Sequence, residues 1–522
     1  MNIARILSDQ ATAHGEAPAL IDVQDGRDRV LSFRGLESAS ARFAEQIARC
    51  GINAGDSVLI LHPMKAELYA FLIALFRLGA VGMFLDPSAG REYVERCLRI
   101  SRPKAFFGSA KVQLLRLAIP ELRRIPLSFC SSPVPFSRHL SLHGLGTELG
   151  AIAWRAESDP ALITFTSGST GEPKAALRTH GFLLAQHRAL QTSLHHKAGT
   201  VDLTTLPVFV LANLASGVAS VIPDADLTKP GQISPRPVIR QLQRLPITTM
   251  AASPAFVARL TAECHRSNLR IPSMERICMG GAPVFPNDLR QAHDTFTLAE
   301  ISAVYGSTEA EPMAEISLSM ISEADFDSMN QGRGLLAGRP VASISLRIMS
   351  DRWGTSIPAV SEPEFQTLCM PADVVGEIVV SGDHVLHGYL HGTGDDETKF
   401  HVDGTVWHRT GDLGRLDNQG RLWLLGRASA AIKDERGTLY PFAVECAARQ
   451  IPGVRCAAIL SVEGRRVLAL EADWREVDPA AREMLAWAQL DEISLLRTIP
   501  MDKRHNAKVD YVSLRRLFST AK

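Results

Sequence analysis

The chain has 522 residues, more than one hydrophobic core normally supports, so at least two domains are expected. Charged residues make up 21% of the chain and sum to a formal net charge of zero, which argues against non-specific nucleic-acid binding and against a strong attraction to anionic membranes. The eight cysteines are scattered, without a Cys-x-x-Cys pair or a zinc-type His/Cys cluster, which indicates a reduced, cytoplasmic setting.

The N-terminal part of the chain alternates between helical and strand patterns. Residues 1–18 lack the apolar core of a signal peptide. Apolar residues recur at helical spacing from Leu36 to Ile47, and Gly51 is expected to end that helix. An apolar strand over Ser57–Leu61 follows.

The most apolar long stretch, residues 68–84, is interpreted as a buried helix and a strand rather than a membrane span. Arg77 and Gly79 interrupt it, so no run reaches the ~18 apolar residues that a span requires. The pattern predicts a helix over residues 64–78, ended by Gly79, and a strand over residues 80–85.

The alternation continues through the middle of the chain and predicts an α/β fold. Strands that are apolar on both faces indicate a mostly parallel sheet covered by helices. The expected elements are helices over 181–190, 235–245 and 254–265 and strands over 201–206 and 247–251. Residues 376–382 resemble an antiparallel strand, and residues 357–373, rich in Pro, Ser and Glu, are expected to form a surface loop.

A change of pattern after Arg427 predicts a second, smaller domain. Residues 455–461 and 465–471 form two strand-like runs of a hairpin, and Asp478-Pro479 supplies the N-cap and first turn of a helix. We therefore expect a domain of helix-covered, mostly parallel sheets over residues 1–427 and a small α+β domain over residues 428–522.

A glycine-rich loop directly follows the apolar run 161–165 and reads Thr166-Ser167-Gly168-Ser169-Thr170-Gly171-Glu172-Pro173-Lys174. Glycines let the backbone approach a ligand, hydroxyls and amides donate to phosphate oxygens, and lysine adds a positive charge. Pro173-Lys174-Ala175 replaces the Gly-Lys-Ser/Thr of a Walker A loop. The loop therefore indicates a different kind of phosphate site, with a solvated turn between strands as the alternative.

Further motifs follow this loop in a fixed order. They are Gly280-Gly281-Ala282-Pro283, Tyr305-Gly306-Ser307-Thr308-Glu309, Trp407-His408-Arg409-Thr410-Gly411-Asp412 and Gly426-Arg427, with Lys508 near the C-terminus. In this order they resemble the adenylate-forming superfamily, which includes acyl-CoA synthetases, amino-acid adenylation domains and luciferases. The resemblance extends from about Leu31 to Leu514.

The resemblance implies a large N-terminal domain with a small mobile C-terminal lid, and a reaction that uses ATP and Mg²⁺. The carboxylate of an acid would attack the α-phosphate of ATP to give an acyl-adenylate and pyrophosphate. Thr166, Glu309 and Lys508 are the implied catalytic residues; Glu309 would also bind Mg²⁺, with a helix cap or surface carboxylate as its alternative role. The implied nucleotide-binding residues are Ser167, Gly168, Ser169, Thr170, Gly171, Lys174, Gly281, Ala282, Pro283, Tyr305, Gly306, Ser307, Thr308, Asp412 and Arg427.

The resemblance also implies separate roles within this set. Tyr305 would stack on adenine, Asp412 and Arg427 would bind the ribose hydroxyls, and Lys508 would reach the α-phosphate. Core packing is the alternative role for Tyr305. For Lys508 the alternative is a surface lysine, and Lys503 is its rival for the catalytic role.

Three departures from the superfamily pattern bear on the reaction. Val210 stands where a histidine is frequent, Ser429 occupies a hinge position that is often Asp or Lys, and Arg436 stands where the lid loop usually has glycine. An arginine would crowd the channel through which a thiol arm passes, which argues against thioester formation. The alternative is that Gly437 takes the role of that glycine.

A narrower resemblance, to the olefin-pathway β-lactone synthetases, rests on residues 201–207, 220–224, 437–440 and 504–508. Those enzymes adenylate a β-hydroxy fatty acid, whose own hydroxyl then displaces AMP and closes a four-membered lactone. Two alternatives stay open: a ligase that forms a thioester with CoA or an acyl carrier protein, and an inactive homologue that binds a nucleotide or acyl group.

The acyl pocket is expected between residues 206–217 and the backbone of 280–283. Phe209, Leu211 and Leu214 make it apolar, and no fixed charge there suits an amino-acid ammonium group. A fatty carboxylic acid is therefore the expected substrate. An acyl carrier protein or a pathway enzyme is a further candidate partner, and nucleic acid is not expected.

Overall fold

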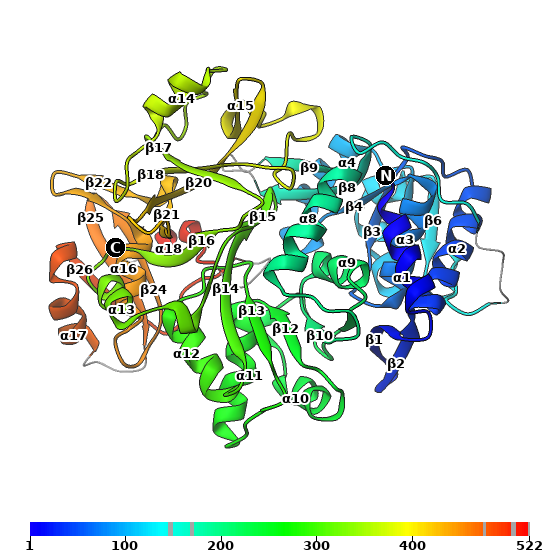
Figure 1. Cartoon of the computed structure of the whole chain (residues 1–522), viewed down its shortest axis with the longest axis horizontal. Helices are drawn as coiled ribbons and strands as arrows, with labels where there is room; N and C mark the ends of the chain where they lie inside the picture. The colour runs from blue at the N-terminus through cyan, green and yellow to red at the C-terminus, as the bar shows by residue number, and fades with distance from the viewer. Residues whose placement is uncertain (145–149, 168–171, 473–476, 503–507, 520–522) are drawn as a thin grey trace. The chain divides into compact units, whose positions relative to one another are not determined.

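The computed structural model of the protein describes residues 1–144, 150–167, 172–472, 477–502 and 508–519, and it forms two compact units (Figure 1). The first comprises Met1–Ala225, Pro237–Ala251 and Asp383–Asp395, and the second comprises Asp226–Arg236, Ala252–Gly382 and Asp396–Lys522. Within the described ranges, no helix is both long and apolar enough to span a bilayer. The predicted domain boundary after Arg427 stays a prediction.

One sheet of the first unit is parallel except at its last strand pair, β8–β9, which is antiparallel. In spatial order its strands are β7 (Arg138–His139), β6 (Leu127–Cys130), β5 (Ala105–Gly108), β3 (Ser57–Leu61), β4 (Val81–Phe84), β8 (Pro160–Ser167) and β9 (Pro173–Thr179).

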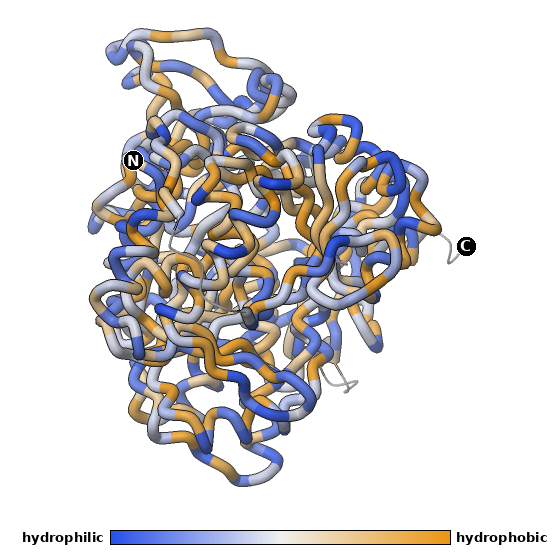
Figure 2. Tube along the Cα trace, turned by 90° about the vertical axis from the view of Figure 1, so that its right-hand side faces the viewer, coloured by the Kyte–Doolittle hydropathy of each residue, from blue (hydrophilic) through white to orange (hydrophobic). Residues whose placement is uncertain are grey.

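Alternate side chains of this sheet pack on different helices, as expected for strands buried on both faces. Phe107 of β5 stacks on Phe71 of α3 (Ala66–Leu78), with ring centroids 4.1 Å apart. The preceding Phe106 belongs instead to a core cluster with Val94 and Leu98 of α4 (Arg91–Ser101). Coloured by hydropathy, the Cα trace alternates between hydrophobic and hydrophilic segments along its length (Figure 2).

The N-terminal elements confirm the predictions made from apolar spacing. The helix expected around Leu36–Ile47 is α2 (Phe33–Arg49), and the strand over Ser57–Leu61 is β3. The apolar stretch forms α3, buried along nearly its whole length, followed by β4. Gly79 ends α3 with a φ of 70°, in the left-handed region that favours glycine.

The elements predicted in the middle of the chain are also confirmed. They are α8 (His180–Ser193), β10 (Val201–Thr204), α10 (Pro235–Arg244), β12 (Thr249–Ala252) and α11 (Pro254–Arg266). β10 pairs in parallel with β12 and with β11 (Ala219–Val221), and β11 pairs in parallel with β1 (Pro18–Gln24), which β2 (Arg27–Ser32) joins antiparallel.

The main sheet of the second unit begins with two parallel strands and continues with antiparallel ones. β13 (Arg276–Met279) and β14 (Glu300–Ser307) are parallel. The antiparallel strands that follow in spatial order are β15 (Ala310–Ser317), β16 (Leu335–Pro340), β21 (Leu422–Arg427), β20 (Thr405–Leu416), β18 (Gly376–Ser381) and β17 (Ser345–Met349), with β19 (Lys399–Val402) also paired to β20. The antiparallel strand predicted at 376–382 is therefore confirmed as β18.

Residues 357–373 lie mostly at the surface as predicted, but the prediction of a loop is wrong, because the segment contains helix α14 (Glu362–Leu368). The Glu364 carboxylate accepts hydrogen bonds from the backbone N–H and the hydroxyl of Ser361, both at 2.8 Å, which caps the helix start. Phe365 is fully buried, with its ring centroid 4.7 Å from that of Trp407. Capping and one aromatic anchor outweigh the loop-like composition.

The C-terminal elements confirm the predicted α+β segment. β24 (Val454–Val462) and β25 (Arg465–Ala472) form the expected hairpin, whose turn residues Glu463 and Gly464 both have positive φ. β26 (Glu492–Leu496) pairs in parallel with β25, and α16 (Pro441–Ala448), α17 (Val477–Met484) and α18 (Tyr511–Ser519) complete the segment.

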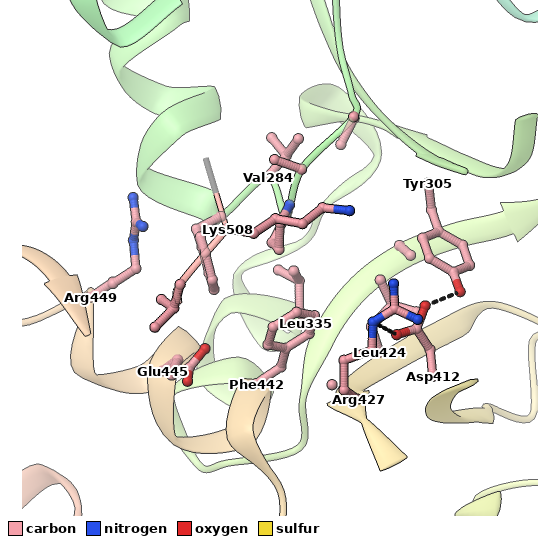
Figure 3. Close-up of a pocket in the computed structure, with 18 of the residues that line it drawn as sticks. Val284, Tyr305, Leu335, Asp412, Leu424, Arg427, Phe442, Glu445, Arg449 and Lys508 are labelled. Atoms are coloured by element: carbon pink, nitrogen blue, oxygen red, sulfur yellow. Dashed lines mark hydrogen bonds and ion pairs between the residues drawn. The ribbon is translucent and has the colours of Figure 1, made fainter. Parts of the chain in front are cut away.

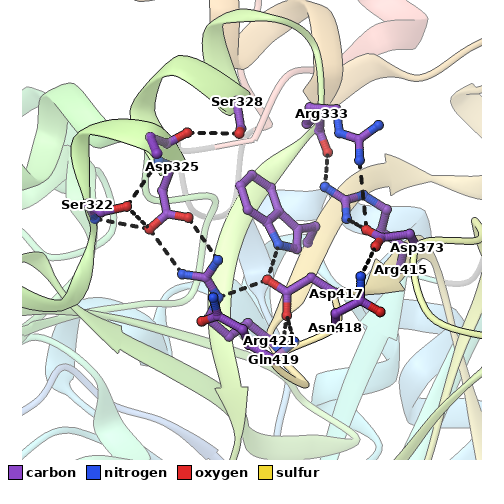
Figure 4. Close-up of polar contacts among 12 residues, drawn as sticks. Ser322, Asp325, Ser328, Arg333, Asp373, Arg415, Asp417, Asn418, Gln419 and Arg421 are labelled. Atoms are coloured by element: carbon purple, nitrogen blue, oxygen red, sulfur yellow. Dashed lines mark hydrogen bonds and ion pairs between the residues drawn. The ribbon is translucent and has the colours of Figure 1, made fainter.

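A polar network holds the hairpin formed by β20 and β21 (Figure 4). Arg421 donates to both carboxylate oxygens of Asp325 on α13 (Glu323–Asn330), at 2.8 and 3.0 Å, and to Asp417 at 2.8 Å. The Trp423 indole N–H also donates to Asp417, at 3.0 Å. These contacts fix the closed end of a hairpin whose open end enters the candidate site.

Candidate active site

A pocket of about 270 Å³ in the second unit is lined by residues from several of the predicted motifs (Figure 3). Its remaining lining is largely apolar and includes Val284, Leu335 and Phe442. The predicted site residues that line it are Gly281, Ala282, Pro283, Tyr305, Gly306, Ser307, Asp412, Arg427 and Lys508. Segments far apart in the sequence therefore meet in one cavity.

The two parallel strands of the main sheet supply one wall. Residues 281–283 follow β13, and Tyr305, Gly306 and Ser307 end the neighbouring β14. The carboxyl ends of parallel strands lie at the same edge of a sheet, so these segments lie side by side. Gly281 has a φ of 79°, which favours glycine in this wall.

Asp412 lies at the centre of a hydrogen-bonded group. The Tyr305 hydroxyl donates to Oδ2 of Asp412 at 2.8 Å, and Nε of Arg427 lies 3.2 Å from Oδ1. The register of β20 with β21 pairs Asp412 directly with Arg427, whose Nη1 also donates to the Thr410 carbonyl at 2.9 Å. Burial, reinforced by the Asp412 charge, raises the pKa of Tyr305 well above its usual value, so the hydroxyl stays a donor. The oriented carboxylate keeps lone pairs that can accept further hydroxyl groups.

Lys508 extends into the pocket toward the side that holds Tyr305 and Asp412 (Figure 3). Its backbone N–H donates to the Asp502 carboxylate at 2.9 Å, and its carbonyl accepts from the Asp502 backbone N–H at 2.7 Å. The side chain stays accessible, yet surrounding protein displaces enough water to lower the pKa of Lys508, and the Arg427 charge lowers it further. The pocket thus contains a lysine whose backbone is held by two hydrogen bonds to Asp502.

Glu309 and Thr308 occupy the turn between β14 and β15, and both are half-buried. The Glu309 backbone N–H donates to the Ser307 hydroxyl at 3.2 Å. Asp412, and more weakly Tyr305 and Glu309, raises the pKa of Arg427, which puts Glu309 within electrostatic reach of the pocket. No group of three or more His, Cys, Asp or Glu side chains gathers as a metal site in the described residues. A single carboxylate fits Mg²⁺, which often binds one or two carboxylates together with substrate phosphates.

The glycine-rich loop belongs to the first unit. Thr166, near the end of β8, pairs with Lys174 of β9, and Ser167 pairs with Pro173. Lys174 is buried, with its Nζ 5.7 Å from the centroid of the Tyr389 ring. Gly168, Ser169, Thr170 and Gly171 lie outside the described residues.

The predicted acyl-binding segment also belongs to the first unit. It forms helix α9 (Pro207–Ala215), which follows β10 in the sequence. Phe209, Leu211 and Leu214 of this helix are all buried. Their predicted part in an acyl pocket stays a prediction.

The structure adds Glu445 and Tyr511, which carried no predicted role, to the pocket lining. The buried Glu445 carboxylate accepts from the Tyr511 hydroxyl and from the Ile459 backbone N–H, the latter at 3.2 Å. Burial raises the pKa of Glu445 to about 7. Tyr511 follows Lys508 by three residues, so this contact ties the lysine-bearing segment to α16.

The structure also locates the atypical lid-loop arginine. Arg436 is ion-paired with Asp434 at 2.9 Å and with Asp491 at 2.8 Å, both from the same C-terminal segment. The next residue, Gly437, has a φ of 100° with open space where a Cβ would lie. Glycine is therefore favoured at position 437, one residue after the expected place.

Comparison with known proteins identifies relatives along most of the chain. A family described as "AMP-binding enzyme" matches residues 7–390. Olefin beta-lactone synthetases from Stenotrophomonas maltophilia and Xanthomonas campestris pv. campestris are 31% and 30% identical, each over 92% of this chain and 90% of the relative. A 2-succinylbenzoate–CoA ligase from Geobacillus kaustophilus is 27% identical, over 92% of this chain and 87% of the relative.

Solved structures share the fold at low sequence identity. The amide bond synthetase McbA from Marinactinospora thermotolerans matches with a TM-score of 0.80 and 21% identity, over 99% of both chains. The O-succinylbenzoate coenzyme A synthetase MenE from Bacillus subtilis, in complex with AMP, matches with a TM-score of 0.77 and 22% identity, over 99% of this chain and 98% of that one. These matches agree with the mixed α/β fold and its small C-terminal segment.

Proposed function

Because this chain belongs to the AMP-binding enzyme family and is thus an adenylate-forming enzyme that activates an acid, we propose that its substrate is a β-hydroxy fatty acid, which it converts to a β-lactone. The observation that carries the activation step is the meeting of Tyr305, Asp412, Arg427 and Lys508 in one pocket. The proposed substrate and product rest on the two olefin beta-lactone synthetases that align with 92% of the chain.

In the proposed first step, the acid carboxylate attacks the α-phosphate of ATP, and pyrophosphate leaves. Asp412 and Arg427 would bind the ribose hydroxyls, with Tyr305 beside the adenine. Lys508 would neutralise charge that builds on the α-phosphate, an interaction that is stronger in the transition state than in the ground state. Glu309 would bind Mg²⁺, which screens the phosphate charge.

The remaining predicted residues are assigned to the phosphate side of the same reaction. Thr166 and Lys174, with the loop residues 168–171 between them, would close over the β- and γ-phosphates of ATP. Ser167 and Thr308 would donate hydroxyl hydrogen bonds there. Residues 428–522 would act as a lid that carries Lys508 into and out of the pocket.

In the proposed second step, the β-hydroxyl oxygen attacks the acyl carbon, its proton is released, and AMP leaves with the electrons of the broken carbon–oxygen bond. The product equals the acid minus one water. An internal nucleophile has a high effective concentration, so no external thiol is required.

A second candidate function, thioester formation with CoA or an acyl carrier protein, is favoured by a separate observation. Gly437 adopts a backbone that favours glycine beside Arg436, whose guanidinium is held by Asp434 and Asp491. The glycine of the lid loop would then be displaced by one residue rather than lost, and the thiol channel could stay open.

Product analysis by mass spectrometry separates these functions. Purified protein receives ATP, Mg²⁺ and a racemic 2-alkyl-3-hydroxy fatty acid, with and without CoA. A product lighter than the acid by one water, formed without CoA, is expected. A CoA thioester as the only product would establish the second candidate, and no acid-dependent pyrophosphate exchange with any acid would indicate an inactive homologue.

The Lys508→Ala variant tests the activation step. Loss of one positioned charge should slow acid-dependent pyrophosphate exchange by roughly 10²–10³-fold while calorimetry still detects ATP binding. Lys503→Ala, which removes the rival lysine, is the matched control and should exchange normally. The opposite result would assign the catalytic role to Lys503.

A further inference from the structure

One edge of the first unit exposes three large apolar side chains within residues 110–139. Leu114 is 64% exposed, Leu117 is 74% exposed and Phe136 is 96% exposed. Val112 and Leu115 of the same segment pack against the core cluster, so its apolar residues are divided between an inner and an outer side. Leu114 and Leu117 are therefore exposed on a segment whose other apolar side chains pack normally against the core.

Hydrogen bonds hold together the two segments that carry these side chains. The Ser128 hydroxyl lies 3.1 Å from Oε1 of Gln113 and 2.5 Å from the hydroxyl of Ser137. Gln113 directly precedes Leu114, and Ser137 directly follows Phe136. Leu117 lies three residues beyond Leu114, across the short helices α5 (Ala110–Gln113) and α6 (Leu115–Ala118), so both can project from one side.

The segment that carries this group is basic, although the whole chain has no net charge. Residues 110–139 contain five Lys or Arg against one acidic residue, Glu121, which gives a local net charge of +4. The Arg123 guanidinium donates to the carbonyls of Arg116 and Leu117, at 2.9 and 3.0 Å, which places it beside the apolar group. The basic residues are Lys111, Arg116, Arg123, Arg124 and Arg138.

A cavity of about 350 Å³ adjoins this edge and is also basic. It includes His139 of strand β7, directly after Arg138. Among the described residues, Nε of Arg42 is buried there without a hydrogen-bond partner. The lining residues are Arg42, Glu45, Gln46, Arg49, His139, Ser141, His143 and Gly144.

We propose that this edge docks on an anionic phospholipid bilayer. The lipid-facing edge consists of Leu114, Leu117, Phe136 and the basic residues of the same segment. Apolar side chains that project singly enter the boundary between headgroups and acyl chains, while arginines remain at the phosphates. The basic cavity then receives a headgroup phosphate. The zero net charge of the chain argues against a strong attraction of the whole molecule to such a membrane, but the local charge of this edge acts within about one Debye length, ~8 Å at physiological salt.

The observations favour a bilayer over an acidic protein partner. Apolar side chains beside Lys and Arg are typical of segments that lie on anionic membranes. Here Arg116 directly precedes Leu117, and the Arg123 guanidinium donates to the Leu117 carbonyl, so apolar and basic groups lie together as the layered polarity of a membrane surface requires. The proposal concerns a surface outside the nucleotide pocket and holds whichever product the enzyme makes.

Vesicle binding by the full chain tests the proposal directly. Phe136→Trp reports insertion through the difference between its emission and that of the parent, which has six tryptophans. This difference should shift to the blue with vesicles of phosphatidylcholine and phosphatidylglycerol but not with phosphatidylcholine alone. Leu298→Trp is the matched control, since Leu298 is 73% exposed on the second unit, and its emission should not move. Equal shifts in both variants, or none in Phe136→Trp, would overturn the proposal.

Co-sedimentation gives a second measurement. The Leu114→Ser/Leu117→Ser/Phe136→Ser variant should bind the anionic vesicles at least about tenfold more weakly, since it removes the buried apolar area. Leu298→Ser/Met320→Ser, which changes residues 73% and 71% exposed, should bind like the parent. Arg123→Gln/Arg124→Gln should reduce the salt dependence of binding. Binding to soluble polyglutamate but not to vesicles would indicate an acidic protein partner and contradict the membrane proposal.

Discussion

The buried ion pair between Arg409 and Glu377 allows a quantitative test of how the fold supports the pocket. Neither side chain has exposed surface, and the guanidinium donates to both carboxylate oxygens, with Nε to Oε1 at 3.0 Å and Nη2 to Oε2 at 2.7 Å. Arg409 lies on β20 three residues before Asp412. The pair therefore anchors the strand that carries the central carboxylate of the pocket.

Removing one partner leaves the other charge buried and uncompensated. Arg409→Met also removes the donors to the carbonyls of Thr355 and Glu397, at 2.5 and 3.3 Å. A broken buried pair costs about 3–5 kcal/mol, whereas replacing both partners by apolar residues is often nearly neutral. We therefore expect Arg409→Met and Glu377→Met each to lose about 3–5 kcal/mol, and the double variant to lose clearly less than their sum.

Urea unfolding followed by tryptophan fluorescence measures these losses. Burial raises the pKa of Glu377, and loss of Arg409 would raise it further, so the deficit of Arg409→Met should shrink as the pH falls. Pyrophosphate exchange should fall with stability in the single variants and recover in part in the double variant. Single losses below about 1 kcal/mol, or strictly additive losses, would refute the reasoning.

Three further predictions follow from the site and the core. Burial raises the pKa of Glu445 from 4.5 to about 7. The bound proton therefore stabilises the native state fully below pH ~4.5, and this stabilisation is lost as the pH rises through 7. The free energy of unfolding of Glu445→Gln, measured by urea titration, should rise by about 3 kcal/mol relative to that of the parent between pH 4.5 and 8. Tyr305→Phe removes a 2.8 Å hydrogen bond to Asp412 and should weaken ATP binding about tenfold by calorimetry, with little change in melting temperature. Phe365→Ala should cost about 3–5 kcal/mol of stability yet leave ATP affinity unchanged; unchanged stability would show that α14 does not depend on this ring.

The sequence by itself determined the elements whose signals are local. The apolar run of α3 and its terminal Gly79 specify a buried helix within a few residues, and the short segment between two strand-like runs marks the turn after β24. The order of the motifs also identified the family before any contact was known. Loop-like composition failed at α14, because the capping contact and the burial of Phe365 depend on neighbours that composition does not describe.

Only the tertiary structure decided which side chains meet. Tyr305 and Asp412 are separated by 107 residues, and their 2.8 Å contact depends on strand pairing and register rather than on either local sequence. The same holds for Glu445 and Tyr511, 66 residues apart, whose contact supports the segment of Lys508. Periodicity and turn residues act over a few bonds, whereas a pocket forms where packed elements bring distant residues together, so its geometry exists only in the folded chain.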